Sequence, residues 1–132
     1  MSATSYYRRK DLDNLTGVAA YAAPTLYLSL HTADPGVAGS HANEISGGGY
    51  TRVSLAGVMG AADADGISVN TSVISVGPAS TDWGTVAYLG IEDSAVVGAG
   101  NMLCPGAPTM PRTITTGQPF QIPVGQLRLR KA

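Results

Sequence analysis

The chain has 132 residues, of which 44% are hydrophobic and only 13% are charged, and its formal net charge is −1. This length suits one domain with a single core, and the regular apolar segments exclude a disordered chain. The charge balance argues against nucleic acid as a partner, and no apolar stretch reaches the roughly 18 residues that span a membrane. Because soluble monomers usually carry more charge, we expect much of the surface to lie against other proteins, including copies of the same chain.

The N-terminal segment, residues 4–16, is the part of the chain whose sequence predicts a helix. Thr4 or the residue after it can cap the start, and Gly17 suits the position just past the end. Leu12 and Leu15 lie three residues apart and share one face. Because so short a helix is marginal alone, these leucines should pack onto the sheet or onto a neighbouring protein.

The basic residues gather at the two ends of the chain. Six of the eight are Arg8, Arg9, Lys10, Arg128, Arg130 and Lys131. We expect these ends to dock on an acidic neighbouring subunit, with two solvated ends as the alternative. Asp11 and Asp13 stand where a signal peptide would have its apolar core, so we expect the protein to be made and kept in the cytoplasm, or to leave it by cell lysis.

The segment from Thr25 to His31 has the period-2 pattern of a half-buried strand. Leucines at positions 26, 28 and 30 face one way, and Tyr27, Ser29 and His31 face the other. A turn at residues 34–36, Asp-Pro-Gly, follows the strand, because proline fixes φ and glycine accepts a positive φ. The small residues around this turn predict a long presented loop, residues 32–49.

The rest of the chain predicts further short strands separated by turns that contain Gly, Pro or Asp. These strands cover residues 50–58, 66–76, 85–91, 101–104, 112–115, 119–124 and 127–130. The alternation within 66–76 breaks at Asn70-Thr71-Ser72, which indicates a bulge or two short strands. Seven or eight such strands predict an all-β fold, an antiparallel sandwich or a jelly-roll-like barrel, with a short N-terminal helix. We divide the chain into a helical arm, residues 1–17, and a β-sandwich domain, residues 18–132.

Candidate catalytic or metal-binding residues are few. His31 and His41 are the only histidines, and a cluster with Asp34 and Glu44 would give a metal or general-base site. Their spacing matches no known ligand pattern, so we predict no catalytic, metal or cofactor site and no enzyme activity. The Asp-Ala-Asp-Gly sequence at 63–66 resembles the opening of a calcium loop, but a strand follows it, so we predict an Asp-Gly turn.

Cysteine and tryptophan each occur once. Cys104 cannot form an intramolecular disulfide, and its apolar neighbours predict a buried, inert thiol. Trp83 lies beside glycine, where its ring could stack on a ligand such as a carbohydrate, but we favour a place in the core.

Several sequence elements together match a known family. They are LTG at residues 15–17 after the helix, LYLSLHTADPG at 26–36, EISGGGYTR at 44–52, WGTV at 83–86 and GNML at 100–103. On these elements, which span nearly the whole chain, the sequence resembles a group of small tailed-bacteriophage virion proteins that are often labelled tail-fibre or minor structural proteins. The resemblance implies a component of the virion that has no catalytic residues.

Within a virion we expect a capsid decoration, or cement, subunit, because such proteins are also poor in charge, rich in small residues and β-structured. Fibres more often contain repeats or heptads, and this sequence has none. The alternative is a tail-tip or tail-fibre-associated structural protein. A third hypothesis is a module that binds carbohydrate on the host surface through Trp83, His31 and the loop 32–49.

We expect the partners to be further copies of the chain, with a trimer as one arrangement, and a major capsid or tail protein, but neither nucleic acid nor membrane. The protein would join the virion in the host cytoplasm. The residues expected to contact partners lie in the arm, in the loop 32–49 and beside it. They are Tyr6, Tyr7, Arg8, Arg9, Lys10, Leu12, Leu15, His31, Asp34, Pro35, His41, Glu44, Tyr50 and Arg52.

Overall fold

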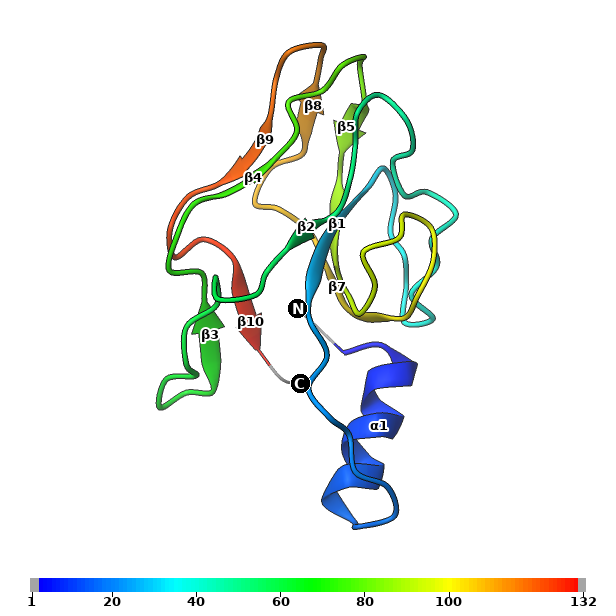
Figure 1. Ribbon diagram of the computed structural model, residues 1–132, viewed down its shortest axis with the longest axis vertical. Helices are drawn as coiled ribbons and strands as arrows, with labels where there is room; N and C mark the ends of the chain where they lie inside the picture. Colours follow the sequence, from blue (N-terminus) through cyan, green and yellow to red (C-terminus); the bar gives the residue numbers. More distant parts are fainter. Residues whose placement is uncertain (1–2, 131–132) are drawn as a thin grey trace.

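Strands dominate the computed structural model, which describes residues 3–130, and one helix precedes them (Figure 1). The helix is α1, Ser5–Leu15. The ten strands of the described residues are β1 (Tyr27–His31), β2 (Val53–Ser54), β3 (Ile67–Val69), β4 (Ile74–Val76), β5 (Gly84–Val86), β6 (Tyr88–Glu92), β7 (Met102–Gly106), β8 (Arg112–Ile114), β9 (Phe120–Ile122) and β10 (Arg128–Arg130). The predicted all-β class with a short N-terminal helix is confirmed.

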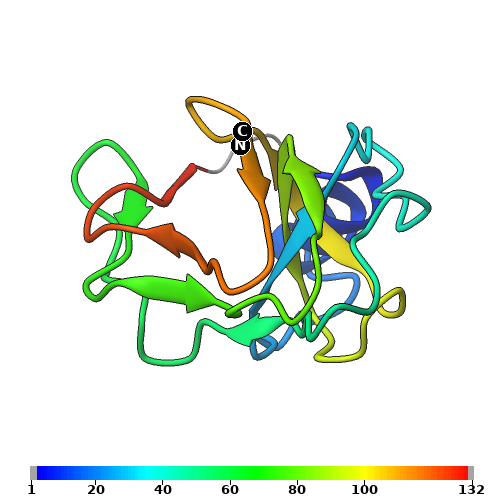
Figure 2. The ribbon, with the colours of Figure 1, turned by 90° about the horizontal axis from the view of Figure 1, so that it is seen from above.

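The strands form one four-stranded sheet and three two-stranded ladders, which lie around a common centre (Figure 2). The sheet has the order β2-β1-β6-β7, and the ladders pair β3 with β10, β4 with β9 and β5 with β8, all antiparallel. In the middle of the sheet Leu28 lies opposite Ile91, and Leu30 lies opposite Leu89. The result is a barrel-like arrangement of short pieces of sheet.

The strands outnumber the seven or eight predicted because two predicted segments are interrupted. The first break lies at Asn70, whose side-chain nitrogen donates to the carbonyls of Ser72 and Pro123, both at 2.9 Å. Its side-chain oxygen accepts from the backbone nitrogen of Leu127 at 2.9 Å. These bonds satisfy backbone groups outside any ladder, and they separate β3 from β4. The segment predicted at 85–91 divides in the same way into β5 and β6.

The apolar core fills the space between the large sheet and the ladders. Leu28 is 0% exposed and Phe120 is 1% exposed, and full burial of such side chains stabilises a fold by roughly 1.5–3 kcal/mol each. Trp83 packs edge-on against Tyr50, with ring centroids 5.7 Å apart, and its indole nitrogen donates to the Gly48 carbonyl at 2.8 Å. Trp83 is 7% exposed, so its predicted place in the core is confirmed.

Strand β1 differs from its prediction because both of its faces are buried. Ser29 and His31 are 0% exposed, as are Leu28 and Leu30 on the other face. The loop 32–49 packs over the polar face, and its residue Ile45 donates its backbone N–H to the Leu30 carbonyl at 3.0 Å. The prediction of a half-buried strand is therefore wrong, since alternation along one strand does not show what covers its polar side.

The ends of α1 have the predicted caps. Thr4 is the N-cap, and its Oγ1 accepts a hydrogen bond from the backbone nitrogen of Tyr7 at 3.3 Å. Gly17 follows the helix with a positive φ of 78°, which glycine adopts at no steric cost. No helix among the described residues has the length and apolarity that would let it cross a membrane.

The helix is fastened to the barrel at its first residues. Thr4 donates from its backbone nitrogen to the Leu103 carbonyl at 2.8 Å and from Oγ1 to the Met102 carbonyl at 2.6 Å, so it covers part of the outer edge of β7. Ser5 donates to the Val37 carbonyl of the loop 32–49 at 2.9 Å. Beyond this base, α1 projects from one end of the molecule and buries none of its residues (Figure 1).

Two smaller predictions concern the turn at residues 63–66 and the cysteine. Asp63 Oδ1 accepts from the backbone nitrogens of Asp65 and Ile67, and Gly66 has a φ of 75°, so the turn is confirmed. Cys104 is partly buried, and burial raises the pKa of its thiol. The division into an arm and a domain stays a prediction, and its residues Met1, Ser2, Lys131 and Ala132 lie outside the described residues.

Candidate functional site

Polar side chains gather beneath the loop 32–49, on the face that β1 and β6 share. Ser29 and Glu92 are both 0% exposed, and Ser29 Oγ donates to Glu92 Oε1 at 3.0 Å. His41, from the loop, places its Nε2 atom 2.9 Å from Glu92 Oε2. Gly90 leaves room for this arrangement, because a Cβ atom there would lie 2.5 Å from Ser29 Oγ. Glu92 therefore joins the two strands to the loop above them.

His31 lies in the same place as a neutral ring. The single proton of the Ser29 hydroxyl goes to Glu92, so the 2.8 Å contact between Ser29 Oγ and His31 Nε2 requires the proton on that nitrogen. Burial lowers the pKa of His31 to about 4 and outweighs the opposing influence of Glu44. Nδ1 is buried and has no hydrogen-bond partner among the described residues.

Arg52 and Glu44 form the second half of the arrangement. Arg52 donates from Nε and Nη2 to the two carboxylate oxygens of Glu44, at 2.8 and 2.7 Å, and the two side chains are 0% and 1% exposed. Its Nη1 atom donates to the carbonyls of Ser94 and Ala99 at 2.8 and 2.9 Å. Since a guanidinium fork matches a carboxylate closely, Arg52 fixes the loop 32–49 to the segment 93–101.

Tyr50 completes the hydrogen bonding of Glu44. Its hydroxyl donates to Glu44 Oε2 at 2.7 Å and accepts from the backbone nitrogen of Leu30 at 3.1 Å. Burial opposes ionisation of Glu44, but hydrogen bonds from Arg52, Tyr50 and a backbone amide outweigh it and keep the carboxyl pKa below its usual value. Burial, together with the bond to Glu44, raises the pKa of the Tyr50 phenol. We call the whole set the buried polar network; its members are Ser29, His31, His41, Glu44, Tyr50, Arg52 and Glu92.

The buried polar network holds the loop 32–49 against the strands β1 and β6. Its charged groups bond to one another, and His31, the candidate base, is fully buried against Ser29. Asp34, the fourth member of the conceivable metal cluster, accepts from the backbone nitrogen of Gly36 at 2.8 Å within its own turn. Among residues 3–130, no three His, Cys, Asp or Glu side chains are placed to share a metal ion.

Sequence reasoning missed two members of the network, Ser29 and Glu92. Both lie in strands that read as mostly apolar, and Glu92 is 63 residues from its hydrogen-bond donor. A carboxylate at the end of a buried strand is a signal in itself, because a charge there must be paired. The sequence does not show which residues pair with it, since that depends on the antiparallel register of β1 and β6.

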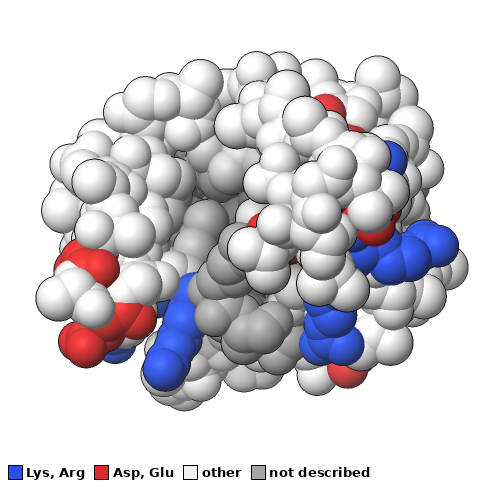
Figure 3. Space-filling view, turned by 90° about the horizontal axis from the view of Figure 1, so that it is seen from below, with Lys and Arg blue, Asp and Glu red and all other residues white. Residues whose placement is uncertain are grey.

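In contrast to the buried polar network, the helix α1 has its side chains at the surface. Leu12 is 58% exposed and Leu15 81%, and Val18, just beyond the arm, is 75% exposed. Several Lys and Arg side chains lie on the face of the molecule toward which α1 projects (Figure 3). An exposed apolar edge beside positive charge is typical of a surface that contacts another protein.

The predicted contact residues fall into two sets. The arm set, exposed or half-buried, comprises Tyr6, Tyr7, Arg8, Arg9, Lys10, Leu12 and Leu15. In the loop set, Asp34 is exposed, His41 and Glu44 are partly buried, and His31, Pro35, Tyr50 and Arg52 are buried. Partner contact by these residues stays a prediction. The helix and the loop 32–49 are in contact at the base of α1, where the backbone nitrogen of Ser5 donates to the Val37 carbonyl. The carbohydrate-binding hypothesis requires an exposed ring at Trp83 or His31, but both side chains are buried.

A hollow of about 410 Å³ lies between α1 and the barrel. Its lining includes Tyr7 of the helix, Leu103 of β7 and Leu129 of β10. Tyr21 borders it too, with its ring centroid 5.9 Å from that of Tyr7. The Tyr21 hydroxyl is buried and has no hydrogen-bond partner in residues 3–130, and burial raises its pKa to about 12. The helix is therefore not close-packed against the barrel.

A protein-family model described as "Podophage GP4 fiber I protein gp80" matches residues 2–130, which is nearly the whole chain. A search of curated proteins found no match.

Proposed function

Because the chain belongs to the family of the podophage GP4 fiber I protein gp80, a family of tailed-phage structural proteins, we propose that it is a subunit of a phage tail fibre or of its attachment site. Membership of this family makes the chain a component of the virion. In our proposal it acts through contacts with other proteins and catalyses no reaction. Its partners are further copies of the chain or a neighbouring tail protein.

The observation that carries the proposal is the exposure of α1. This eleven-residue helix is fastened at its base, buries none of its residues and leaves Leu12 and Leu15 more than half exposed. Isolated helices of this length are marginal in water, and an apolar helix edge gains stability when a partner covers it. The partner would bury the leucines, and the neighbouring Arg8, Arg9 and Lys10 would face acidic groups on it.

Capsid decoration is the alternative position within the virion. The low charge and the many small residues of the chain support capsid decoration, but these properties suit a fibre subunit equally well. The description of the matched family names a fibre, which favours the tail. Both positions require a surface that binds other virion proteins, so the arm serves either one.

The double substitution Leu12→Ser and Leu15→Ser tests the arm. It is sharper than deletion of residues 1–17, because deletion would also remove Thr4 and uncover the edge of β7. Phage that carry the double variant should contain about tenfold fewer copies per particle by quantitative mass spectrometry. The purified variant should unfold within about 0.5 kcal/mol of the wild type, since both side chains are exposed.

Val73→Ser is the matched control, because Val73 is similarly exposed, at 56%, and lies outside the arm. Its copy number should equal that of the wild type. Normal incorporation of the double variant would contradict a role for the arm in attachment. Reconstruction of the wild-type particle would distinguish a tail-fibre subunit from a capsid decoration subunit, because density for the chain would lie either in the tail fibres or on the capsid.

A further inference from the structure

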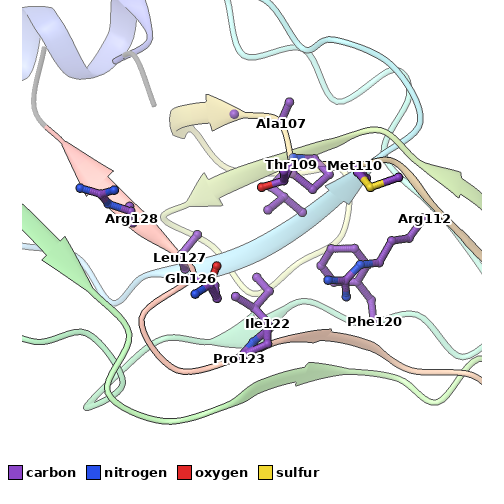
Figure 4. A pocket seen from close by; sticks show the side chains of 13 residues that line it. Ala107, Thr109, Met110, Arg112, Phe120, Ile122, Pro123, Gln126, Leu127 and Arg128 are labelled. Atoms are coloured by element: carbon purple, nitrogen blue, oxygen red, sulfur yellow. The ribbon is translucent and has the colours of Figure 1, made fainter.

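A second hollow, distinct from the one beneath α1, lies inside the barrel. It has a volume of about 680 Å³ and lies between the β7–β8 connection and the β9–β10 turn (Figure 4). This volume is within the range of about 300–1,000 Å³ that is typical of ligand sites. No residue of α1 lines it, so any role of this cavity is separate from that of the arm.

The cavity combines an apolar floor with a basic rim. Buried Phe120, Ile122 and Leu127 form much of the floor. Arg112 and Arg128 lie at the rim, and no Asp or Glu is among the lining residues that the structure describes. Outside the lining, Asp63 is near enough to feel the charge of Arg128. An apolar floor below two arginines suits a ligand with both apolar and acidic groups.

Arg112 is held in position above the floor. Its guanidinium carbon lies 5.1 Å from the centroid of the Phe120 ring, and Nη1 donates to the Gln121 carbonyl at 2.5 Å. Figure 4 shows the Arg112 side chain beside the ring of Phe120 at the cavity.

Two strand edges border the same cavity. β7 is the last strand of the four-stranded sheet, and β10 has β3 as its one partner among the described strands. Thr4 covers β7 at Met102 and Leu103, whereas Gly106, at the other end of β7, lines the cavity together with Arg128 of β10. At the cavity β7 carries Pro105, which has no backbone N–H. β10 contains no proline, so its edge can offer both N–H and C=O groups to an incoming extended chain.

We propose that this cavity binds an extended peptide segment of another protein, in which apolar and acidic side chains alternate. Alternate side chains of an extended chain point to opposite sides, so one set would enter the apolar floor and the other would reach the arginines of the rim. The backbone of the segment would pair with the edge of β10. This second docking point does not depend on the arm.

Synthetic peptides of about eight residues, which span roughly 26 Å when extended, are suitable probes. One alternates valine or threonine with glutamate, and two matched peptides carry glutamine or lysine instead of glutamate. Fluorescence anisotropy with the purified chain at low salt should show about tenfold tighter binding of the glutamate peptide than of the lysine peptide.

Two variants locate the binding. Ala107→Trp places a large side chain at an exposed position of the lining. This variant should bind the glutamate peptide about tenfold more weakly, or weaker still, than the wild type does. The pair Arg112→Gln and Arg128→Gln should abolish the preference for glutamate over glutamine. The pair Arg8→Gln and Arg9→Gln changes the net charge equally on α1 and should leave binding unchanged.

The proposal is overturned if the glutamate and lysine peptides bind alike, or if Ala107→Trp binds as tightly as the wild type. It is also overturned if an acidic oligosaccharide, such as an oligouronate, binds more tightly than the glutamate peptide and loses its binding in Ala107→Trp. Thermal unfolding of each variant, compared with the wild type, separates loss of binding from loss of the fold.

Discussion

Arg52 is the cation between two buried carboxylates. It forms a bidentate pair with Glu44, and its Nη1 atom lies 3.8 Å from Glu92 Oε2. The substitution Arg52→Met would leave both carboxylates buried without this counter-ion. Removing one partner of a buried pair costs about 3–5 kcal/mol, and we expect a loss of this size in the free energy of unfolding measured with denaturant.

Arg52→Lys is the control for charge alone. Lysine keeps the positive charge but cannot make the forked contact, so this variant should lose less stability than Arg52→Met. A free energy of unfolding of Arg52→Met within about 0.5 kcal/mol of the wild type would show that the network does not support the fold.

Gly48 lies where the loop passes closest to the core. Its φ is +62°, and a Cβ atom there would lie 2.7 Å from Thr81 Oγ1 and 2.9 Å from the Trp83 ring. Gly48→Ala should therefore lower the free energy of unfolding by about 2–3 kcal/mol, through backbone strain and steric overlap. Gly47→Ala, with a φ of +73° and no atom within 4 Å of its Cβ, should lose only about 1 kcal/mol. Equal losses in the two variants would contradict the close packing of Trp83 under this loop.

Acid should weaken the fold through His31 and Glu44. The pKa of His31 is lowered to about 4, so between pH 6.5 and this value the unfolded chain takes up a proton that the folded chain does not. The pKa of Glu44 is also lowered, and its contribution is lost at still lower pH. Stability should fall by on the order of 2 kcal/mol as the pH decreases from about 7 to about 4.

Urea unfolding at a series of pH values tests this dependence. His31→Gln removes one of the titrating groups, so its stability should fall less over the same pH range. A wild-type protein that is most stable near pH 4, or a variant with an unchanged slope, would contradict the buried neutral state of His31.

At the scale of single elements, α1 should be the least stable part of the secondary structure. It buries no residue, a hollow separates it from the barrel, and its attachment is concentrated at Thr4 and Ser5. In the isolated chain its backbone amides should exchange hydrogen much faster than those of β1 and β6, which are central in the sheet. Thr4→Val would remove the cap and should speed exchange in α1 further.

Hydrogen exchange followed by NMR gives this comparison amide by amide. Equal protection of α1 and β6 in the isolated chain would mean that the helix is stably packed on its own barrel, and the case for a partner-binding arm would be lost.

The sequence was informative where a structure depends on nearby residues. Thr4 and Gly17 marked the ends of α1, and proline and glycine marked the turns between strands. It was uninformative where distant segments decide the outcome. The covering of Ser29 and His31 depends on Glu92 and on the loop 32–49. The break at Asn70 shows in the alternation of residues 66–76, but its hydrogen bonds with Pro123 and Leu127 do not.

The candidate site divides in the same way. The sequence predicts that Leu12 and Leu15 pack onto the sheet or onto a neighbouring protein, and their exposure in the structure excludes the sheet. The internal bonding of Tyr50, Glu44 and Arg52 could not be foreseen, since these residues look like a surface loop with a strand after it. The cavity inside the barrel arises from the arrangement of β7, β9 and β10 in space, which no local pattern encodes.

At the scale of the whole molecule, the surface is even poorer in charge than the composition indicates. The chain has 8 basic and 9 acidic residues, and the charged groups of Arg52, Glu44 and Glu92 are buried. Large apolar side chains are exposed in the arm and also elsewhere, as at Val37 and Met110. Such a surface suits a subunit that is surrounded by other proteins in its working state.

In our proposal the chain is a virion subunit that is attached through its arm. Reconstruction of the intact phage particle by electron cryomicroscopy would show this attachment. We expect density for the chain at the tail fibres, with α1 packed against a neighbouring subunit and both Leu12 and Leu15 covered. Density in which α1 faces solvent on every copy, or particles that lack the chain altogether, would contradict it.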